Sequence, residues 1–181
     1  MEIYKLKWTR LQNEIFRLLC VKTGKQLNQR TIANLLGVSP TAVAKAIVRL
    51  ENDGVVLIKK DDKMNLTLVE LNRDGEGVID LKRVENLKMF YRSGVVDFLE
   101  ENFPGCVIIL FGSYSYGEDT INSDIDLAVI GGKDKTLNLG KFEKLLGREI
   151  RINFYDNFKT INKNLRSNLC NGVVLAGRLS L

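Results

Sequence analysis

Apolar residues recur at helical spacing through the first fifty residues of the chain and predict three helices. The helices are expected over residues 11–22, 29–36 and 40–52. Asn28 and Ser39 are placed to cap the second and third helices, and a proline after Ser39 suits a first helical position. The positions expected to face the core are Leu11, Ile15, Leu18, Leu19, Ile32, Leu35, Leu36, Val43, Ile47 and Leu50.

Two runs of alternating apolar residues follow, at residues 55–59 and 66–70, with the polar segment KKDDKMN between them. This pattern predicts a β-hairpin. Three helices and a hairpin resemble a winged-helix domain over about residues 8–72, and the run NQRTIANLLGVSPTAVAKAIVRLENDGVV matches that family's pattern. The resemblance implies that the third helix enters the major groove of DNA while the hairpin, or wing, lies along the backbone.

The rest of the chain alternates helical and extended patterns. A long connecting helix is expected within residues 74–104, and it either packs on the sheet of the next domain or forms a dimer interface. Further strands are expected at residues 106–111, 124–130 and 149–155, and further helices near residues 112–118, 139–146 and 157–169. The predicted fold class is α+β, with a winged-helix domain at residues 1–73 and a second domain, a small mixed sheet flanked by helices, at residues 105–181.

The two halves of the chain differ in net charge. Residues 1–73 hold 13 Lys and Arg against 7 Asp and Glu, and residues 74–181 hold 14 against 15. The excess of positive charge therefore lies entirely in the first half, which is the better candidate for contact with a polyanion.

Composition excludes several kinds of chemistry. The chain has no histidine, so histidine triads, zinc–histidine sites and histidine general bases are ruled out. Its three cysteines are widely spaced and form no CxxC motif, which favours free buried thiols over a disulfide or a zinc site. The longest apolar run, residues 106–111, is six residues long, whereas a membrane span needs about 20. With no secretory leader evident, a cytoplasmic protein is expected.

Residues 111–127, FGSYSYGEDTINSDIDL, carry the candidate chemistry. A buried strand runs into Gly112 and Ser113, where a glycine lets the backbone approach an anion and a helix would aim its free N–H groups at it. Asp124 and Asp126 alternate with apolar residues on the next strand, so both side chains share one face. Paired carboxylates can hold Mg²⁺. The alternative is an acidic strand edge exposed to solvent.

This combination resembles the DNA polymerase β-like nucleotidyltransferase superfamily, and its minimal members in particular, over about residues 95–181. The resemblance implies that Gly112 and Ser113 hold the phosphates of a nucleoside triphosphate, with ATP expected. It also implies that Asp124 and Asp126 bind Mg²⁺ or Mn²⁺ during transfer of a nucleoside monophosphate. Minimal members serve as antitoxins that modify a partner toxin, which implies a protein acceptor.

One position departs from that family's pattern. A third carboxylate is expected on the following strand, and its place falls on Arg151. Either Glu149, two residues earlier on the same face, substitutes as a catalytic carboxylate, or Arg151 neutralises the aspartate pair and turnover is lost. Tyr116 stands where many relatives carry a basic residue, and Tyr114 and Tyr116 either stack on a base or are ordinary surface aromatics.

The winged-helix resemblance also implies a set of nucleic-acid contacts. They lie at the start of the second helix, on the exposed face of the third and on the wing: Gln29, Arg30, Thr41, Ala42, Lys45, Arg49, Lys59, Lys60 and Lys63. Asp61 and Asp62 at the wing tip argue against very tight binding. Winged helices also serve as protein–protein modules, in which case these side chains are ordinary solvated surface.

Two hypotheses follow from the sequence. The first is a magnesium-dependent nucleotidyltransferase coupled to a DNA-binding domain. The second is a DNA-binding transcriptional regulator whose second domain has lost turnover and binds a nucleotide or a partner. Either protein could form a homodimer through the helix within residues 74–104.

Overall fold

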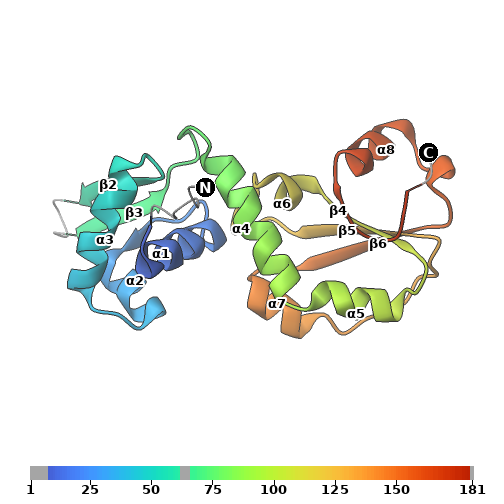
Figure 1. The fold of residues 1–181 in the computed structure, drawn as a ribbon, viewed down its shortest axis with the longest axis horizontal. Coiled ribbons are helices and arrows are strands. Elements are labelled where there is room, and N and C mark those ends of the chain that lie inside the picture. The colour runs from blue at the N-terminus through green and yellow to red at the C-terminus, as the bar shows by residue number, and fades with distance from the viewer. Residues whose placement is uncertain (1–7, 62–65, 180–181) are drawn as a thin grey trace, which may run out of the picture. The chain divides into compact units, whose positions relative to one another are not determined.

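Capping side chains define the helices of the N-terminal part as the sequence predicts. The computed structural model describes residues 8–61 and 66–179, and the chain divides into two compact units, Met1–Val78 and Ile79–Leu181 (Figure 1). In the first unit, Asn28 Oδ1 accepts a hydrogen bond from Thr31 N at 2.8 Å, and Ser39 Oγ accepts one from Ala42 N at 3.2 Å. These bonds satisfy N–H groups that have no partner within their helices.

The first unit has the element order of a winged helix. Its elements are α1 (Arg10–Val21), β1 (Leu27–Asn28), α2 (Gln29–Leu36), α3 (Pro40–Asn52), β2 (Val56–Asp61) and β3 (Leu66–Leu71). The strands form an antiparallel sheet in the order β1-β3-β2, so the hairpin β2–β3 is extended by the short strand β1, which the sequence did not predict.

The core of the first unit follows the predicted stripes with one exception. Ile15, Ile32, Val43 and other stripe residues are fully buried and pack together with the inner face of the hairpin. Leu35 was expected to face inward, but 55% of its surface is exposed. Helix α2 is only eight residues long, and Leu35 lies on its outer side, so the prediction for this residue was wrong.

The second unit begins with two helices where the sequence predicted one. They are α4 (Val78–Arg92) and α5 (Val95–Asn102), and Gly94 between them has a φ of +77°. Ser93 Oγ accepts a hydrogen bond from Val95 N at 3.2 Å, so a new helix starts within a single turn of the break. In the structure nearly all of α4 and the whole of α5 belong to the second unit.

A four-stranded mixed sheet forms the centre of the second unit, in the order β6-β5-β4-β7. Strand β5 is antiparallel to β4 and parallel to β6, and β7 pairs antiparallel with β4. The remaining elements are β4 (Val107–Phe111), α6 (Gly112–Tyr116), β5 (Ile125–Ile130), α7 (Gly140–Leu146), β6 (Ile150–Tyr155), the 3-10 helix η1 (Phe158–Thr160), α8 (Lys163–Cys170) and β7 (Val173–Ala176).

The two faces of this sheet are covered differently. One face packs with α5 and α7 around a large core that includes Ile125, Leu127 and Val129 of β5. The opposite face carries Ala128 and Ile130 and packs with η1 and α8 (Figure 1). Side chains alternate along a strand, so Asp126 belongs to this second face.

The prediction of free buried thiols holds in full for one of the three cysteines. All three cysteines are free, but only Cys20 is buried, while Cys106 is partly exposed and Cys170 is exposed.

Over residues 8–61 and 66–179 no single helix is long and apolar enough to cross a membrane, and only the bent pair α2 and α3 would meet that length and composition together.

Candidate functional site

The turn from β4 into α6 brings the backbone of Gly112 against the carboxylate of Asp126. Gly112 has a φ of +75°, and a Cβ placed on it would lie 2.7 Å from Asp126 Oδ2. The contact arises because Phe111, at the end of β4, pairs directly with Asp126 of β5. A glycine is required here both by the left-handed backbone conformation and by the close approach.

The acidic pair lies at the start of β5. Asp124 directly precedes the strand, and Ile125 N donates to Glu149 O at 2.8 Å, which fixes the two ends of β5 and β6 side by side. Asp126 is inside the strand and half-buried, on the face that η1 and α8 cover only in part. Both aspartates are therefore accessible from one side of the sheet, together with Gly112.

The ionised form of Asp126 is disfavoured by burial and by the neighbouring charge of Asp124 when no cation is bound. Burial raises the pKa of Asp126, and the neighbouring charge of Asp124 raises it further, while Arg151 acts in the opposite direction. The net result is a pKa above the usual value for an aspartate, because removing water and adding a second negative charge both disfavour the ionised form. A bound cation would relieve both effects.

Arg151, rather than Glu149, contacts the acidic pair. The parallel ladder places Arg151 opposite Asp126, and Arg151 Nη1 lies 2.9 Å from Asp124 Oδ2. Glu149 Oε1 is 3.7 Å from Arg151 Nε, and 63% of the Glu149 side chain is exposed. No group of three or more Asp, Glu or Cys side chains within the described ranges is arranged to hold a metal ion.

The acidic pair and the glycine turn still fit one divalent cation. Two carboxylates on one face leave most coordination positions of Mg²⁺ to water and phosphate oxygens, which is how this ion is usually held. The guanidinium of Arg151 competes for Asp124, but 58% of the Arg151 side chain is exposed to solvent. Asp124 and Asp126 would hold the ion, and Gly112 and Ser113 would lie beside its phosphate ligands.

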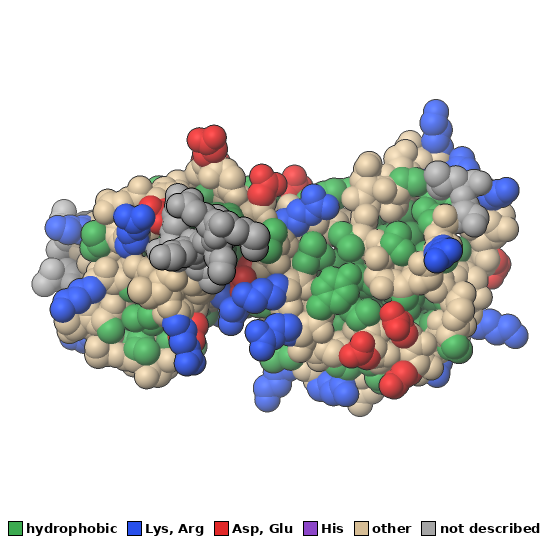
Figure 2. All heavy atoms as spheres, viewed as in Figure 1, with side chains coloured by type: hydrophobic (Ala, Val, Ile, Leu, Met, Phe, Trp, Pro, Cys, Tyr) green, Lys and Arg blue, Asp and Glu red, His purple; other side chains and the backbone are tan. Residues whose placement is uncertain are grey.

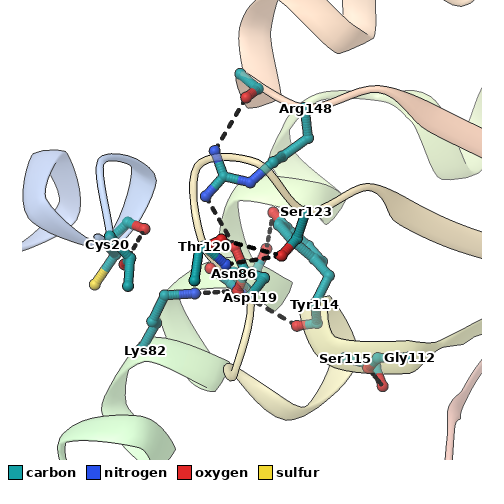
Figure 3. Close-up of polar contacts among 12 residues, drawn as sticks. Cys20, Lys82, Asn86, Gly112, Tyr114, Ser115, Asp119, Thr120, Ser123 and Arg148 are labelled. Atoms are coloured by element: carbon teal, nitrogen blue, oxygen red, sulfur yellow. Dashed lines mark hydrogen bonds and ion pairs between the residues drawn. The ribbon is translucent and has the colours of Figure 1, made fainter. Parts of the chain in front are cut away.

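A buried polar network behind the site was missed from the sequence (Figure 3). The carboxylate of Asp119, in the loop before β5, is ion-paired with Lys82 of α4 and, at 2.9 Å, with Nη2 of Arg148. Asn86 Nδ2 donates to Asp119 Oδ1 at 2.7 Å and to Tyr114 O at 3.0 Å. These side chains come from three separate segments, so only the spacing of Lys82 and Asn86, one helical turn apart, hinted at a shared partner.

Tyr114 is part of this network and cannot stack on a base. Only 2% of the Tyr114 surface is exposed, and its hydroxyl donates to Asn86 O at 3.2 Å. The possibility that this ring contacts a nucleobase was therefore wrong. Tyr116 is partly exposed and lies under the guanidinium of Arg83, with 5.8 Å between Cζ and the ring centroid.

The expected nucleic-acid contacts of the first unit lie on its surface. Thr41, Lys45 and Arg49 are exposed along one side of α3, where Arg49 Nε is 3.3 Å from Asp53 Oδ2. Lys59 of β2 is paired with Glu70 of β3 at 2.7 Å. The other expected contacts are Arg30 and Lys60, which are exposed, and Gln29 and Ala42, which are partly exposed. Asp62 and Lys63 lie outside the described residues.

A comparison with protein families matches part of the second unit. Residues 92–174 match the family model described as a nucleotidyltransferase domain. The search of curated proteins found no match.

Several solved structures are similar to part of this chain. They include the adhesin competence repressor AdcR from Streptococcus pyogenes, with 24% identity over 54% of this chain and 69% of that one and a TM-score of 0.41. Lactococcus lactis ZitR, a zinc-responsive MarR family member, has 21% identity over 55% and 66% and a TM-score of 0.40. A MepR–DNA complex from S. aureus has 17% identity over 52% and 77% and a TM-score of 0.39.

Likeness at these scores is slight, so the winged-helix arrangement of the first unit rests on its own element order and strand pairing. In the second unit, the family match coincides with the strand–Gly-Ser turn and the acidic pair. Residues 92–174 therefore form a nucleotidyltransferase domain.

Proposed function

We propose that this chain binds a nucleoside triphosphate, expected to be ATP, together with Mg²⁺, transfers its nucleoside monophosphate to the hydroxyl of an acceptor and releases pyrophosphate. The observation that carries the proposal is the close contact between the Gly112 backbone and the Asp126 carboxylate. A Cβ placed on Gly112 would lie only 2.7 Å from Asp126 Oδ2. Phosphates held at Gly112 and Ser113 would lie next to the acidic pair, where a shared cation can join them.

Each residue of the site has a distinct role in this proposal. Gly112 and Ser113 bind and orient the β- and γ-phosphates, while Asp124 and Asp126 hold the divalent ion. When bound, that ion neutralises phosphate charge and polarises the phosphoryl group under attack. Glu149 directly precedes β6, beside the start of β5, and would accept the proton of the acceptor hydroxyl, as a general base must.

Nucleotide transfer is tested with labelled ATP, CTP, GTP and UTP plus Mg²⁺ and candidate acceptors, including partner proteins. Asp124→Asn and Asp126→Asn should each abolish label transfer, because an amide cannot replace the charge of a cation ligand. Asp134→Asn, an exposed aspartate elsewhere in the same unit, is the matched control and should retain transfer. Transfer that persists in both site variants would exclude this mechanism.

A second function is favoured by the ion pair between Arg151 and Asp124 at 2.9 Å. In that case the guanidinium replaces a cation, turnover is absent, and the protein is a DNA-binding regulator that senses a nucleotide or a partner. The variant Arg151→Asp distinguishes the two functions, because it supplies a carboxylate opposite Asp126 in the ladder. Transfer that arises only in Arg151→Asp indicates a degenerate site, whereas transfer by the unmodified chain indicates an enzyme.

The first unit is proposed to bind double-stranded DNA through α3 and the wing. Support comes from the exposed Lys45 and Arg49 on one side of α3 and from the excess of basic residues in the first 73 positions. The side chains expected to contribute are Gln29, Arg30, Thr41, Lys45, Arg49, Lys59 and Lys60. Because Lys59 is already paired with Glu70, its contribution should be smaller than that of Lys45.

A further inference from the structure

A cavity of about 420 Å³ lies between η1 and α8 in the second unit, and neither Gly112 nor Asp126 is part of its lining. Its lining includes three cationic side chains, Lys159, Lys163 and Arg166, and no acidic one. The remaining lining residues are Phe158, Ser167, Cys170 and Asn171. The cavity therefore combines an apolar floor with a basic rim and a few hydrogen-bonding groups.

The three cations have no carboxylate partner among the residues described, since none of them takes part in an ion pair there. The sequence explains why. Residues 157–181 contain four Lys and Arg residues and no Asp or Glu, although the chain as a whole has 22 acidic residues. Figure 2 shows Lys and Arg side chains around the end of the second unit at which α8 lies. Uncompensated cations around a cavity favour an anionic ligand.

The position of the cavity relates it to the acidic pair. The side chains of η1 and α8 pack on the sheet face that carries Ala128 and Ile130. Asp126 belongs to the same face by strand alternation. A ligand in the cavity would therefore lie on the same side of the sheet as the nucleotidyltransferase site, with no strand between them.

We propose that the η1–α8 cavity is a binding site for single-stranded nucleic acid. A nucleotide unit has a flat apolar base and an anionic phosphate, which match the apolar floor and the basic rim. A single strand can turn a base into a cavity, whereas a duplex presents its bases only at groove edges. The amide of Asn171 and the hydroxyl of Ser167 add hydrogen-bonding groups suited to a base or a sugar.

This site goes beyond the proposed transfer reaction and does not depend on it. The three cations neutralise about three phosphates, and for a single strand each adds about 0.7 to the slope of log K against log salt. Removing them should therefore lower that slope by about 2. It should also weaken binding of a fluorescent 12-nucleotide RNA by at least about tenfold at 100 mM salt.

The test uses the full chain without nucleotide or metal. The pocket variant is Lys159→Gln/Lys163→Gln/Arg166→Gln. The matched control, Lys133→Gln/Lys135→Gln/Lys144→Gln, removes the same charge from exposed positions of the same unit. The pocket variant should lose affinity and salt slope while the control keeps both. Equal effects from the two variants, or no effect from either, would overturn the proposal.

A chemical footprint localises the bound strand independently of any variant. Cys170 lines the cavity and is exposed, whereas Cys106 lies outside the cavity lining and serves as an internal reference. Saturating RNA should slow alkylation of Cys170 and leave that of Cys106 unchanged, as followed by mass spectrometry.

Competitors identify the source of the ligand. The proposal expects unlabelled RNA or single-stranded DNA to compete at much lower concentration than inorganic tripolyphosphate or ATP. Protection of Cys170 by free ATP or tripolyphosphate alone would instead indicate a mononucleotide or polyphosphate site and overturn the strand proposal. Protection by an acidic peptide but not by RNA would indicate a protein partner and overturn it as well. Nucleotide transfer, measured separately, can fail without altering any of these outcomes.

Discussion

Asp126 takes part in both the close packing and the charge interactions of the site. Its carboxylate contacts the backbone of Gly112, lies opposite Arg151 in the sheet and is close enough to Asp124 for the two charges to repel. Each of these relations follows from the register of β5 between β4 and β6. Single substitutions at Asp126 or at its contacts should therefore change the affinity for Mg²⁺–ATP or the pH dependence of stability.

Gly112→Ala tests the close approach of backbone and carboxylate. The new Cβ would lie 2.7 Å from Asp126 Oδ2, so the carboxylate must move and affinity for Mg²⁺–ATP should fall by about tenfold or more. Gly131→Ala is the control, because Gly131 also has a positive φ, +83°, but nothing lies within 4 Å of its Cβ position. Both variants should lose about 1–2 kcal/mol of stability from backbone strain. Calorimetry should show weakened nucleotide binding for Gly112→Ala alone, and similar weakening in both would refute the contact argument.

Asp126→Asn should make the protein more stable at neutral pH when no divalent ion is present. The folded state raises the pKa of Asp126, so the ionised carboxylate costs stability above that pKa, and the cost disappears as the pH falls through it. The variant's advantage in thermal midpoint should therefore be present near pH 7 and vanish on acidification toward the ordinary aspartate value of 3.8. Asp134→Asn should show no such pH-dependent gain. A lower midpoint for Asp126→Asn at pH 7 would contradict the electrostatic account.

At the scale of elements, α4 precedes most of the residues matched to the nucleotidyltransferase family and holds two loops of the second unit in place. Lys82 and Asn86 project from one side of α4 and bind Asp119 and the backbone of Tyr114 (Figure 3). Close packing reinforces the contact, because a Cβ on Gly117 would lie 2.5 Å from Ile79 O. The loop between the glycine turn and the acidic pair is thereby fixed on α4.

Removing the central carboxylate of this network should lower the free energy of unfolding far more than removing one of its cations. Asp119→Asn removes the carboxylate that is ion-paired with the buried Lys82 and Arg148 and should cost about 3–5 kcal/mol. Lys82→Met keeps the pair of Asp119 with Arg148 and should cost clearly less. Urea unfolding followed by a probe in the second unit measures both, with Asp134→Asn as a surface control. A larger loss in Lys82→Met than in Asp119→Asn would show that the charge balance is not the stabilising factor.

At the scale of the whole molecule, the chain joins a basic unit to a nearly neutral one that carries a nucleotidyltransferase domain. The proposed functions of the two units can be measured separately, since duplex DNA reports on α3 and the wing while Mg²⁺–ATP reports on the acidic pair. The η1–α8 cavity adds a third measurable site through its affinity for a single strand.

Duplex binding by the first unit should depend strongly on salt. If four to six phosphates are neutralised, log K should fall against log salt with a slope of about −4 to −5 between 50 and 300 mM. Lys45→Ala/Arg49→Ala should reduce that slope by about 2, whereas Lys25→Ala, an exposed lysine between α1 and β1, should change it little. Fluorescence anisotropy with a labelled duplex provides the measurement. A slope near zero for the unmodified chain would rule out DNA binding by this unit.

The sequence by itself determined most of the helices and strands and the chemical motif of this protein. Caps at Asn28 and Ser39 and the apolar stripes of the first three helices are local features, so they could be predicted without knowing the fold. The same holds for the Gly-Ser turn after a buried strand and for Asp124 and Asp126 on one face of the next, which led to the nucleotidyltransferase domain that the family match confirms.

Tertiary structure alone decided which side chains meet. Whether Glu149 or Arg151 joins the acidic pair depended on the parallel register of β5 and β6, and that register places Arg151 opposite Asp126. The burial of Tyr114, the network around Asp119 and the basic cavity at α8 arise from segments far apart in the chain. Such contacts are set by packing across the sheet, and no local pattern of polar and apolar residues encodes them.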